Sequence, residues 1–160
     1  MGDGGKGTMM IEGEHMPAVQ VATADGAAFD TAALGTGRTV VYFYPKDDTS
    51  GCTREALDFT ALAADFAAAG IRVVGVSKDP PRAHAKFSAK HDLSVELLSD
   101  ESGAACDAFG VWVEKSMYGK TYMGIERATF LFVDGVCTRA WRKVKVPGHA
   151  QAVLDHATAA

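Results

Sequence analysis

The segment from Val41 to Phe59 places a cysteine where a helix is expected to begin. Its sequence is VYFYPKDDTSGCTREALDF. An apolar, strand-like run ends at Pro45, a polar turn follows, and Cys52 falls in the first turn of the expected helix. Free backbone N–H groups and the helix dipole favour a thiolate there, and the thiolate is the nucleophilic form of cysteine. Cys52 is therefore either a reactive thiol or a buried apolar residue that heads the apolar stripe of its helix.

The neighbours of Cys52 supply some of what a reactive thiol needs. Thr49, three residues earlier, offers a hydroxyl on the same side of the turn, and Pro45 can roof a pocket there. Asp47 and Asp48 oppose a thiolate if their carboxylates face the sulfur. The hypothesis of a reactive Cys52 therefore requires a cation from elsewhere in the chain.

The elements around this segment alternate between strand and helix. Strands are expected at residues 18–23, 39–44, 71–77, 95–99, 128–133 and 136–144. Helices are expected at residues 52–70, 80–92, 100–110 and 147–159. The turn VDGV predicts that the last two strands are antiparallel neighbours, and residues 114–126 are expected to form a loop with partial strand character. This order predicts an α/β fold, with a mixed central β-sheet flanked by helices.

Composition bounds the class of protein. The chain has 160 residues, of which 48% are hydrophobic and 22% charged, and its net charge is -4. The length predicts a single domain, at residues 11–160, and the sequence MGDGGKGTMM at the N-terminus is interpreted as a disordered leader at residues 1–10. The acidic balance argues against nucleic-acid or anionic-membrane partners. No apolar run reaches the roughly 20 residues that a membrane span needs, and we expect a cytoplasmic protein.

Pro45, Thr49 and Cys52 match the P-x-x-x-T-x-x-C motif of the peroxiredoxins. The stretch YFYPKDDTSGCTREA resembles their Q-type branch, the bacterioferritin comigratory proteins. The resemblance continues in order through GVSKD, KFSAKHDL, LLSDESG, KSMYGKTYMGIERATFLFVDG and WRKVKVPGHAQAVL, and covers about residues 12–154. It implies a thioredoxin-like fold. It also supplies the missing cation, because Arg127 in GIERATFLF matches the arginine that peroxiredoxins bring beside the thiol.

The resemblance implies a thiol-dependent peroxidase that reduces hydrogen peroxide and organic hydroperoxides. The thiolate of Cys52 would attack one peroxide oxygen and become a sulfenic acid. The Thr49 hydroxyl, the N–H groups of Gly51 and Cys52, and the guanidinium of Arg127 would hold and polarise the peroxide as hydrogen-bond donors. Pro45 would limit water access. The sulfur is then the redox centre, and no metal, flavin or haem cofactor is expected.

The sulfenic acid must be reduced again, and here the chain departs from many Q-type members. Those members place a resolving cysteine five residues after the first or in the next helix, where this chain has Leu57 and Ser88. Cys106 and Cys137 look packed in apolar surroundings. A one-Cys mechanism with thioredoxin or another small thiol as reductant is therefore favoured, and resolution through Cys106 stays as the alternative.

Two other functions fit a reactive cysteine. A thiol–disulfide oxidoreductase on the same fold would want a C-x-x-C pair, which the sequence lacks. A redox sensor or holdase would use Cys52 only as a switch. We expect a monomer or a weak dimer.

Four of the histidines stand in pairs two helical turns apart. His84 and His91 form one pair, and His149 and His156 form the other. No cysteine or carboxylate joins either pair at ligand spacing, so we expect exposed helix residues and not a metal site.

Overall fold

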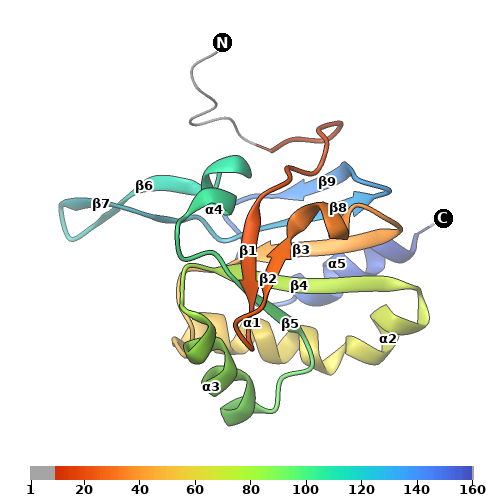
Figure 1. Ribbon diagram of the computed structural model, residues 1–160, viewed down its shortest axis with the longest axis horizontal. Helices are drawn as coiled ribbons and strands as arrows, with labels where there is room; N and C mark the ends of the chain where they lie inside the picture. The colour runs from red at the N-terminus through yellow and green to blue at the C-terminus, as the bar shows by residue number, and fades with distance from the viewer. Residues whose placement is uncertain (1–9, 160) are drawn as a thin grey trace.

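A seven-stranded mixed sheet forms the centre of the molecule (Figure 1). The computed structural model describes residues 10–159. The strand order is β2-β1-β5-β4-β3-β8-β9. The strands of this sheet are β1 (Gln20–Thr23), β2 (Ala28–Asp30), β3 (Arg38–Phe43), β4 (Ile71–Ser77), β5 (Glu96–Ser99), β8 (Ala128–Val133) and β9 (Val136–Trp141).

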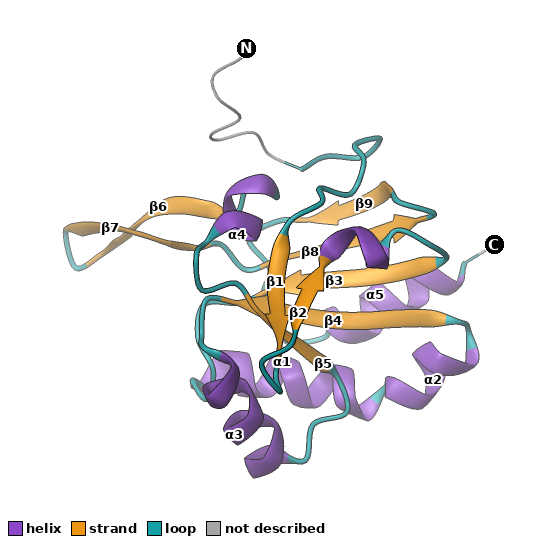
Figure 2. Cartoon of the chain, viewed as in Figure 1, coloured by secondary structure: helices purple, strands orange, loops and turns teal. Residues whose placement is uncertain are grey.

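The described helices cover the two faces of the sheet unequally, as Figure 2 shows. The larger helical layer packs α1 (Ser50–Ala61), α2 (Ala63–Ala68), α3 (Pro81–His91) and α5 (His149–Thr158) on one face. The opposite face receives the short helices η1 (Thr31–Leu34) and α4 (Ala104–Ala108).

Strand β3 runs through the middle of the sheet and separates two apolar cores. It is parallel to β4 and antiparallel to β8. Because successive side chains of a strand point to opposite faces, Val41 and Phe43 join the core under α4, and Val40 and Tyr42 join the core under α1. The strand is buried from its second residue onward, so its carboxyl end, where the loop to α1 begins, is firmly anchored.

The predicted fold class is confirmed: the fold is thioredoxin-like, with a mixed central sheet flanked by helices. The six predicted strands all occur, and Asp134 and Gly135 form the predicted tight turn between β8 and β9. The single helix expected at residues 52–70 is interrupted at Leu62, which separates α1 from α2. Strand β2 and helix η1 were not expected; both are short, with four residues at most.

The expectation of a loop with partial strand character at residues 114–126 is right about the strand character and underestimates its extent. Strands β6 (Trp112–Met117) and β7 (Lys120–Ile125) form a separate antiparallel hairpin there, turned by Tyr118 and Gly119 at positive φ. The hairpin projects away from the sheet at one end of the molecule (Figure 1). Most of its side chains are exposed on both faces, so the sequence carries no apolar alternation that would reveal two strands.

The leader expected at residues 1–10 lies outside the described residues except for Met10. Met10 packs in the core under α4 with 3% of its surface exposed. Within the described residues, every helix is too short or too polar to cross a bilayer.

Candidate functional site

Cys52 lies at the head of α1, directly after the loop that leaves β3. Thr49 is the N-cap residue in extended conformation, and the helix begins at Ser50. The first intrahelical bond runs from the N–H of Thr53 to the carbonyl of Thr49. The N–H groups at Gly51 and Cys52 precede that bond, so they are the free donors of the first turn. The predicted helix-terminal setting of the thiol is therefore present.

Arg127 reaches Cys52 from the short connection between β7 and β8. Its Nη2 lies 3.4 Å from the Cys52 Sγ, which is 2% exposed. Its Nη1 donates to Oε1 of Glu55 at 2.6 Å. A Cβ at Gly51 would lie 3.2 Å from Nη2, so the glycine leaves the guanidinium room to approach the sulfur.

Thr49 and Pro45 belong to the segment that joins β3 to α1, and both are exposed. The Thr49 hydroxyl donates to the carbonyl of Lys46 at 2.9 Å. Its proton is therefore in use within the loop, and its oxygen is left as an acceptor. This differs from the expectation that the Thr49 hydroxyl donates to a substrate, and it comes from the tight turn between Lys46 and Thr49.

Glu55 belongs to the site, and the sequence reasoning missed it. Its side chain is 1% exposed, and its Oε2 has no hydrogen-bond partner among the described residues. Burial raises the pKa of this carboxyl to about 7, although the Arg127 charge acts in the opposite direction. The available signal was spacing: Glu55 follows Cys52 by three residues, which places both on one face of the helix.

The backbone around Arg127 is held on both sides. The Glu126 N–H donates to the carbonyl of Val111 at 2.7 Å, and the Val144 N–H donates to the carbonyl of Arg127 at 2.9 Å. The Glu126 carboxylate accepts two bonds from the guanidinium of Arg142, at 3.0 and 3.1 Å. These contacts fix the position of the Arg127 backbone, from which its side chain extends to Cys52.

Lys115 adds a second cation near this region. From β6, its Nζ donates to the carbonyl of Ile125 at 2.6 Å. Burial and then the Arg127 charge lower the pKa of Lys115. Charges of both signs therefore surround Arg127: the cation of Lys115 and the carboxyl groups of Glu55 and Glu126.

Cys106 and Cys137 lie in the other core. Both are buried, as expected, and both belong to the cluster under α4, whereas Cys52 belongs to the cluster under α1. Burial, followed by the charge of Asp100, raises the pKa of Cys106, and burial raises the pKa of Cys137 to about 11. All three cysteines are free thiols. The central sheet lies between Cys52 and the other two.

The expectation of exposed histidines is wrong for His84 and His149, and His91 is only partly exposed. His84 is fully buried, and His149 is buried with its Nε2 at 2.8 Å from the Thr129 hydroxyl. Burial, and then the charge of Arg127, lowers the pKa of His149 to about 4. His156 is exposed as expected. The helical spacing was read correctly, but it did not reveal that the first histidine of each pair faces the core.

Asp47, Asp79 and His84 bring carboxylate and imidazole atoms within 4.8 Å of one another, a distance that suits a metal ion. Hydrogen bonds to the protein already satisfy these atoms. The Asp47 carboxylate bonds Tyr44 and His84, and Asp79 bonds Ser77 and the N–H of Asp47. Both oxygens of Asp47, both ring nitrogens of His84 and Oδ2 of Asp79 are therefore engaged in a polar network within the protein.

Comparisons with known proteins point in one direction. Residues 13–138 match the AhpC/TSA family. The chain is 54% identical over 116 residues to "Peroxiredoxin Bcp" of Xanthomonas campestris, covering 72% of each chain. It is 43% identical over 148 residues to "Putative peroxiredoxin bcp" of Coxiella burnetii, covering 91% of this chain and 98% of that one.

Solved structures agree. The X. campestris bacterioferritin comigratory protein superposes with a TM-score of 0.82 at 46% identity, covering 87% of this chain and 89% of that one. A cysteine-to-serine mutant of PrxQ from Xylella fastidiosa superposes with a TM-score of 0.87 at 36% identity, covering 94% and 96%.

The buried carboxyl of Glu55 gives the stability of this chain a pH dependence. Its folded-state pKa of about 7 lies above the usual 4.5, so its contribution to stability is complete below pH 4.5 and is lost as the pH rises through about 7. Glu55→Gln should remove this loss, which amounts to about 3 kcal/mol at most. Urea denaturation across this pH range measures the difference between the variant and the wild type.

The exposed Glu101→Gln serves as the control, because an exposed carboxyl should leave the pH profile of the wild type unchanged. A Glu55→Gln profile parallel to that of the wild type would contradict the assignment.

Proposed function

The chain belongs to the Bcp or Q-type peroxiredoxins of the AhpC/TSA family, and from this premise we propose that its thiol-dependent peroxidase activity resides at Cys52. One observation carries the proposal: Cys52 alone of the three thiols has a guanidinium at its sulfur, with Arg127 Nη2 at 3.4 Å. Its place in the first turn of α1 adds free N–H donors to the same spot.

The reaction transfers one oxygen from the peroxide to sulfur. The Cys52 thiolate attacks the nearer oxygen in line with the O–O bond, so that an S–O bond forms while the O–O bond breaks. The leaving alkoxide or hydroxide takes up a proton and departs as an alcohol or water. Cys52 is oxidised to a sulfenic acid, and the peroxide is reduced.

Arg127 and the helix terminus stabilise the charge that moves during this step. The guanidinium is a planar fork, and Glu55 holds one arm at Nη1 so that the other arm, Nη2, faces the sulfur. The N–H groups of Gly51 and Cys52 donate to the peroxide oxygens as they become negative. Thr49, whose proton is bonded to Lys46, accepts the peroxide O–H instead of donating to it. Pro45, in the segment that joins β3 to α1, is proposed to limit water access.

The proposed substrates are hydrogen peroxide and organic hydroperoxides. The X. campestris relative was solved as a trapped intermediate/ligand complex that bears on its alkyl peroxide reduction activity. We extend alkyl peroxides to this chain on the strength of that relative.

We propose a one-Cys cycle with an external thiol, thioredoxin or another small thiol or dithiol, as reductant. The positions at which Q-type members carry a resolving cysteine hold Leu57 and Ser88. Cys106 and Cys137 belong to the core on the other side of the sheet, and burial raises the pKa of each. A cycle that needs free thiols suits the reducing cytoplasm, and we place the protein there as a monomer or weak dimer.

Cys52→Ser should abolish peroxide turnover without unfolding the protein, because serine retains the size of the side chain and loses the nucleophile. Peroxide consumption in the presence of dithiothreitol measures it. Cys137→Ser is the matched control and should keep most of the activity. Substantial turnover by Cys52→Ser would refute the proposal, and consumption of only one equivalent by the wild type would point to a redox sensor instead.

Arg127→Ala should slow the oxidation of Cys52 by at least about tenfold, because charge-assisted hydrogen bonds worth roughly 1.5–3 kcal/mol are lost. Stopped-flow oxidation by hydrogen peroxide measures the rate constant. The same change in a Glu55→Gln background excludes the effect of an uncompensated buried carboxylate. Thr49→Val should also slow oxidation, whereas Thr49→Ser keeps the oxygen. A wild-type rate constant for Arg127→Ala would refute its role.

One equivalent of peroxide should leave a Cys52 sulfenic acid that dimedone traps, with no intramolecular disulfide. Excess peroxide should carry it to the sulfinic acid, since no internal thiol competes. Non-reducing peptide mapping after dimedone treatment distinguishes the products. A Cys52–Cys106 or Cys52–Cys137 peptide as the main product would make this an atypical two-Cys enzyme.

A further inference from the structure

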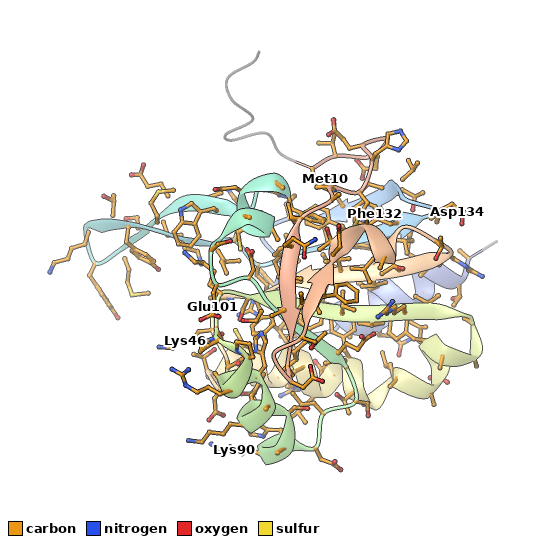
Figure 3. The ribbon with its side chains drawn as sticks, in the orientation of Figure 1. Met10, Lys46, Lys90, Glu101, Phe132 and Asp134 are labelled. Atoms are coloured by element: carbon orange, nitrogen blue, oxygen red, sulfur yellow. The ribbon has the colours of Figure 1, made fainter. Side chains whose placement is uncertain are left out.

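A buried contact between a carboxyl group and an imidazole lies beneath the loop that carries the site. Asp47 belongs to the loop between β3 and α1, and its Oδ2 lies 2.7 Å from Nδ1 of His84 on α3. The His84 side chain is 0% exposed and that of Asp47 6%. Figure 3 labels Lys46 on this loop and Lys90 on α3, and the Nζ of Lys90 bonds Asp48 at 2.8 Å. The loop and α3 are therefore joined at the surface and in the interior.

Every polar side-chain atom of Asp47 and His84 has a hydrogen-bond partner. His84 Nε2 lies 2.9 Å from the carbonyl of Leu98, which can only accept, so Nε2 carries a hydrogen. The Tyr44 hydroxyl donates to Oδ1 of Asp47 at 2.6 Å, which leaves Oδ2 for His84. His84 therefore ties the loop to α3 through its own backbone and to β5 through Leu98.

The backbone of Asp47 is fixed from a second direction. Its N–H donates to Oδ2 of Asp79 at 2.9 Å, and the same oxygen accepts from the Ser77 hydroxyl at 2.6 Å. Asp47 lies between Lys46 and Thr49, whose hydrogen bond closes the turn before α1. A displacement of Asp47 would therefore displace the start of the helix.

We infer that Asp47 and His84 form a latch that holds the loop and the first turn of α1 in the geometry that reacts with peroxide. Both act as positioning residues, because their side chains bond Tyr44, each other and the carbonyl of Leu98, and neither is bonded to Cys52. The inference rests on the proposed role of Cys52 and adds residues that neither the resemblance nor the sulfur's own contacts identify.

Loss of the latch should affect the two half-reactions differently. Oxidation requires the N–H donors, Arg127 and the sulfur in one arrangement, and a shift of about 1 Å costs up to a hundredfold in rate. Reduction of the sulfenic acid by an external thiol requires only access, and the Cys52 side chain is almost fully covered. A loosened loop should therefore slow oxidation without slowing reduction.

The test measures both rate constants by stopped flow, with hydrogen peroxide as oxidant and dithiothreitol as reductant of the sulfenic acid. Asp47→Ala and His84→Ala should lower the oxidation rate constant by roughly ten- to a hundredfold and leave the reduction rate constant unchanged or higher. Lys90→Ala is the matched control: it removes one of the two exposed contacts between Asp48 of the same loop and α3, the other being with His91, and should change neither rate constant.

Asp47→Asn separates hydrogen bonding from charge. The amide oxygen can accept from Tyr44, and the amide N–H can donate to the lone pair of Nδ1 of His84, so the pattern of bonds can be kept. It should recover oxidation to within about threefold of the wild type. Oxidation as slow as that of Asp47→Ala would overturn the latch as a hydrogen-bonded device.

Tyr44→Phe removes a single bond to the latch and guards against variants that do not fold. Its oxidation rate constant should fall by a smaller factor than that of Asp47→Ala, and its reduction rate constant should stay unchanged or rise. Folded Asp47→Ala or Tyr44→Phe protein with wild-type oxidation would overturn the inference, as would equal slowing of both half-reactions. The wild type would still oxidise at Cys52 in each of these cases, so failure of the latch is distinguishable from failure of the proposed function.

Discussion

The site depends on one contact set: a guanidinium held between a thiol and a buried carboxyl. Arg127 places Nη2 at Cys52 and Nη1 at Glu55, and its side chain is only 17% exposed. Burial alone would lower the pKa of Arg127, but the Glu55 carboxylate and the Cys52 sulfur raise it above its usual value. A cation with so little water around it stays in place only if its partners and its backbone are fixed.

The sheet register supplies that fixation. β3 and β8 are antiparallel neighbours, and Phe43, the last residue of β3, is paired with Ala128, the first residue of β8. The loop to Cys52 leaves the sheet where β3 ends, and Arg127 directly precedes Ala128. Both therefore emerge at the same edge of the sheet. A slip of one residue would turn the side chains of β8 to the other face and would separate the guanidinium from the sulfur.

This dependence on register explains which parts could be predicted from the sequence. The strands and the placement of Cys52 at a helix start follow from local apolar patterns and turn residues, which act over a few positions. The meeting of Arg127 with Cys52 depends on strand pairing between distant segments, and only the resemblance suggested it. Glu55 and His84 have ordinary helical spacing, and only the packed structure turns them inward. The hairpin β6–β7 was recognised only as a segment of partial strand character, because exposed side chains, apolar ones such as Tyr122 and Met123 among them, lie on both of its faces and leave no apolar–polar alternation.

The central sheet also affects which thiol can reduce the Cys52 sulfenic acid. β3 gives Val41 and Phe43 to the core that holds Cys106 and Cys137, and Val40 and Tyr42 to the core that holds Cys52. For either distant thiol to reach Cys52, packed segments on both sides of a central, fully hydrogen-bonded strand would have to move. Opening the first turn of α1 would expose Cys52 to an external thiol and would leave the strands between the two cores in place. On the proposed mechanism, the fold therefore favours a reductant from outside, and the contacts beneath the loop govern how easily that turn opens.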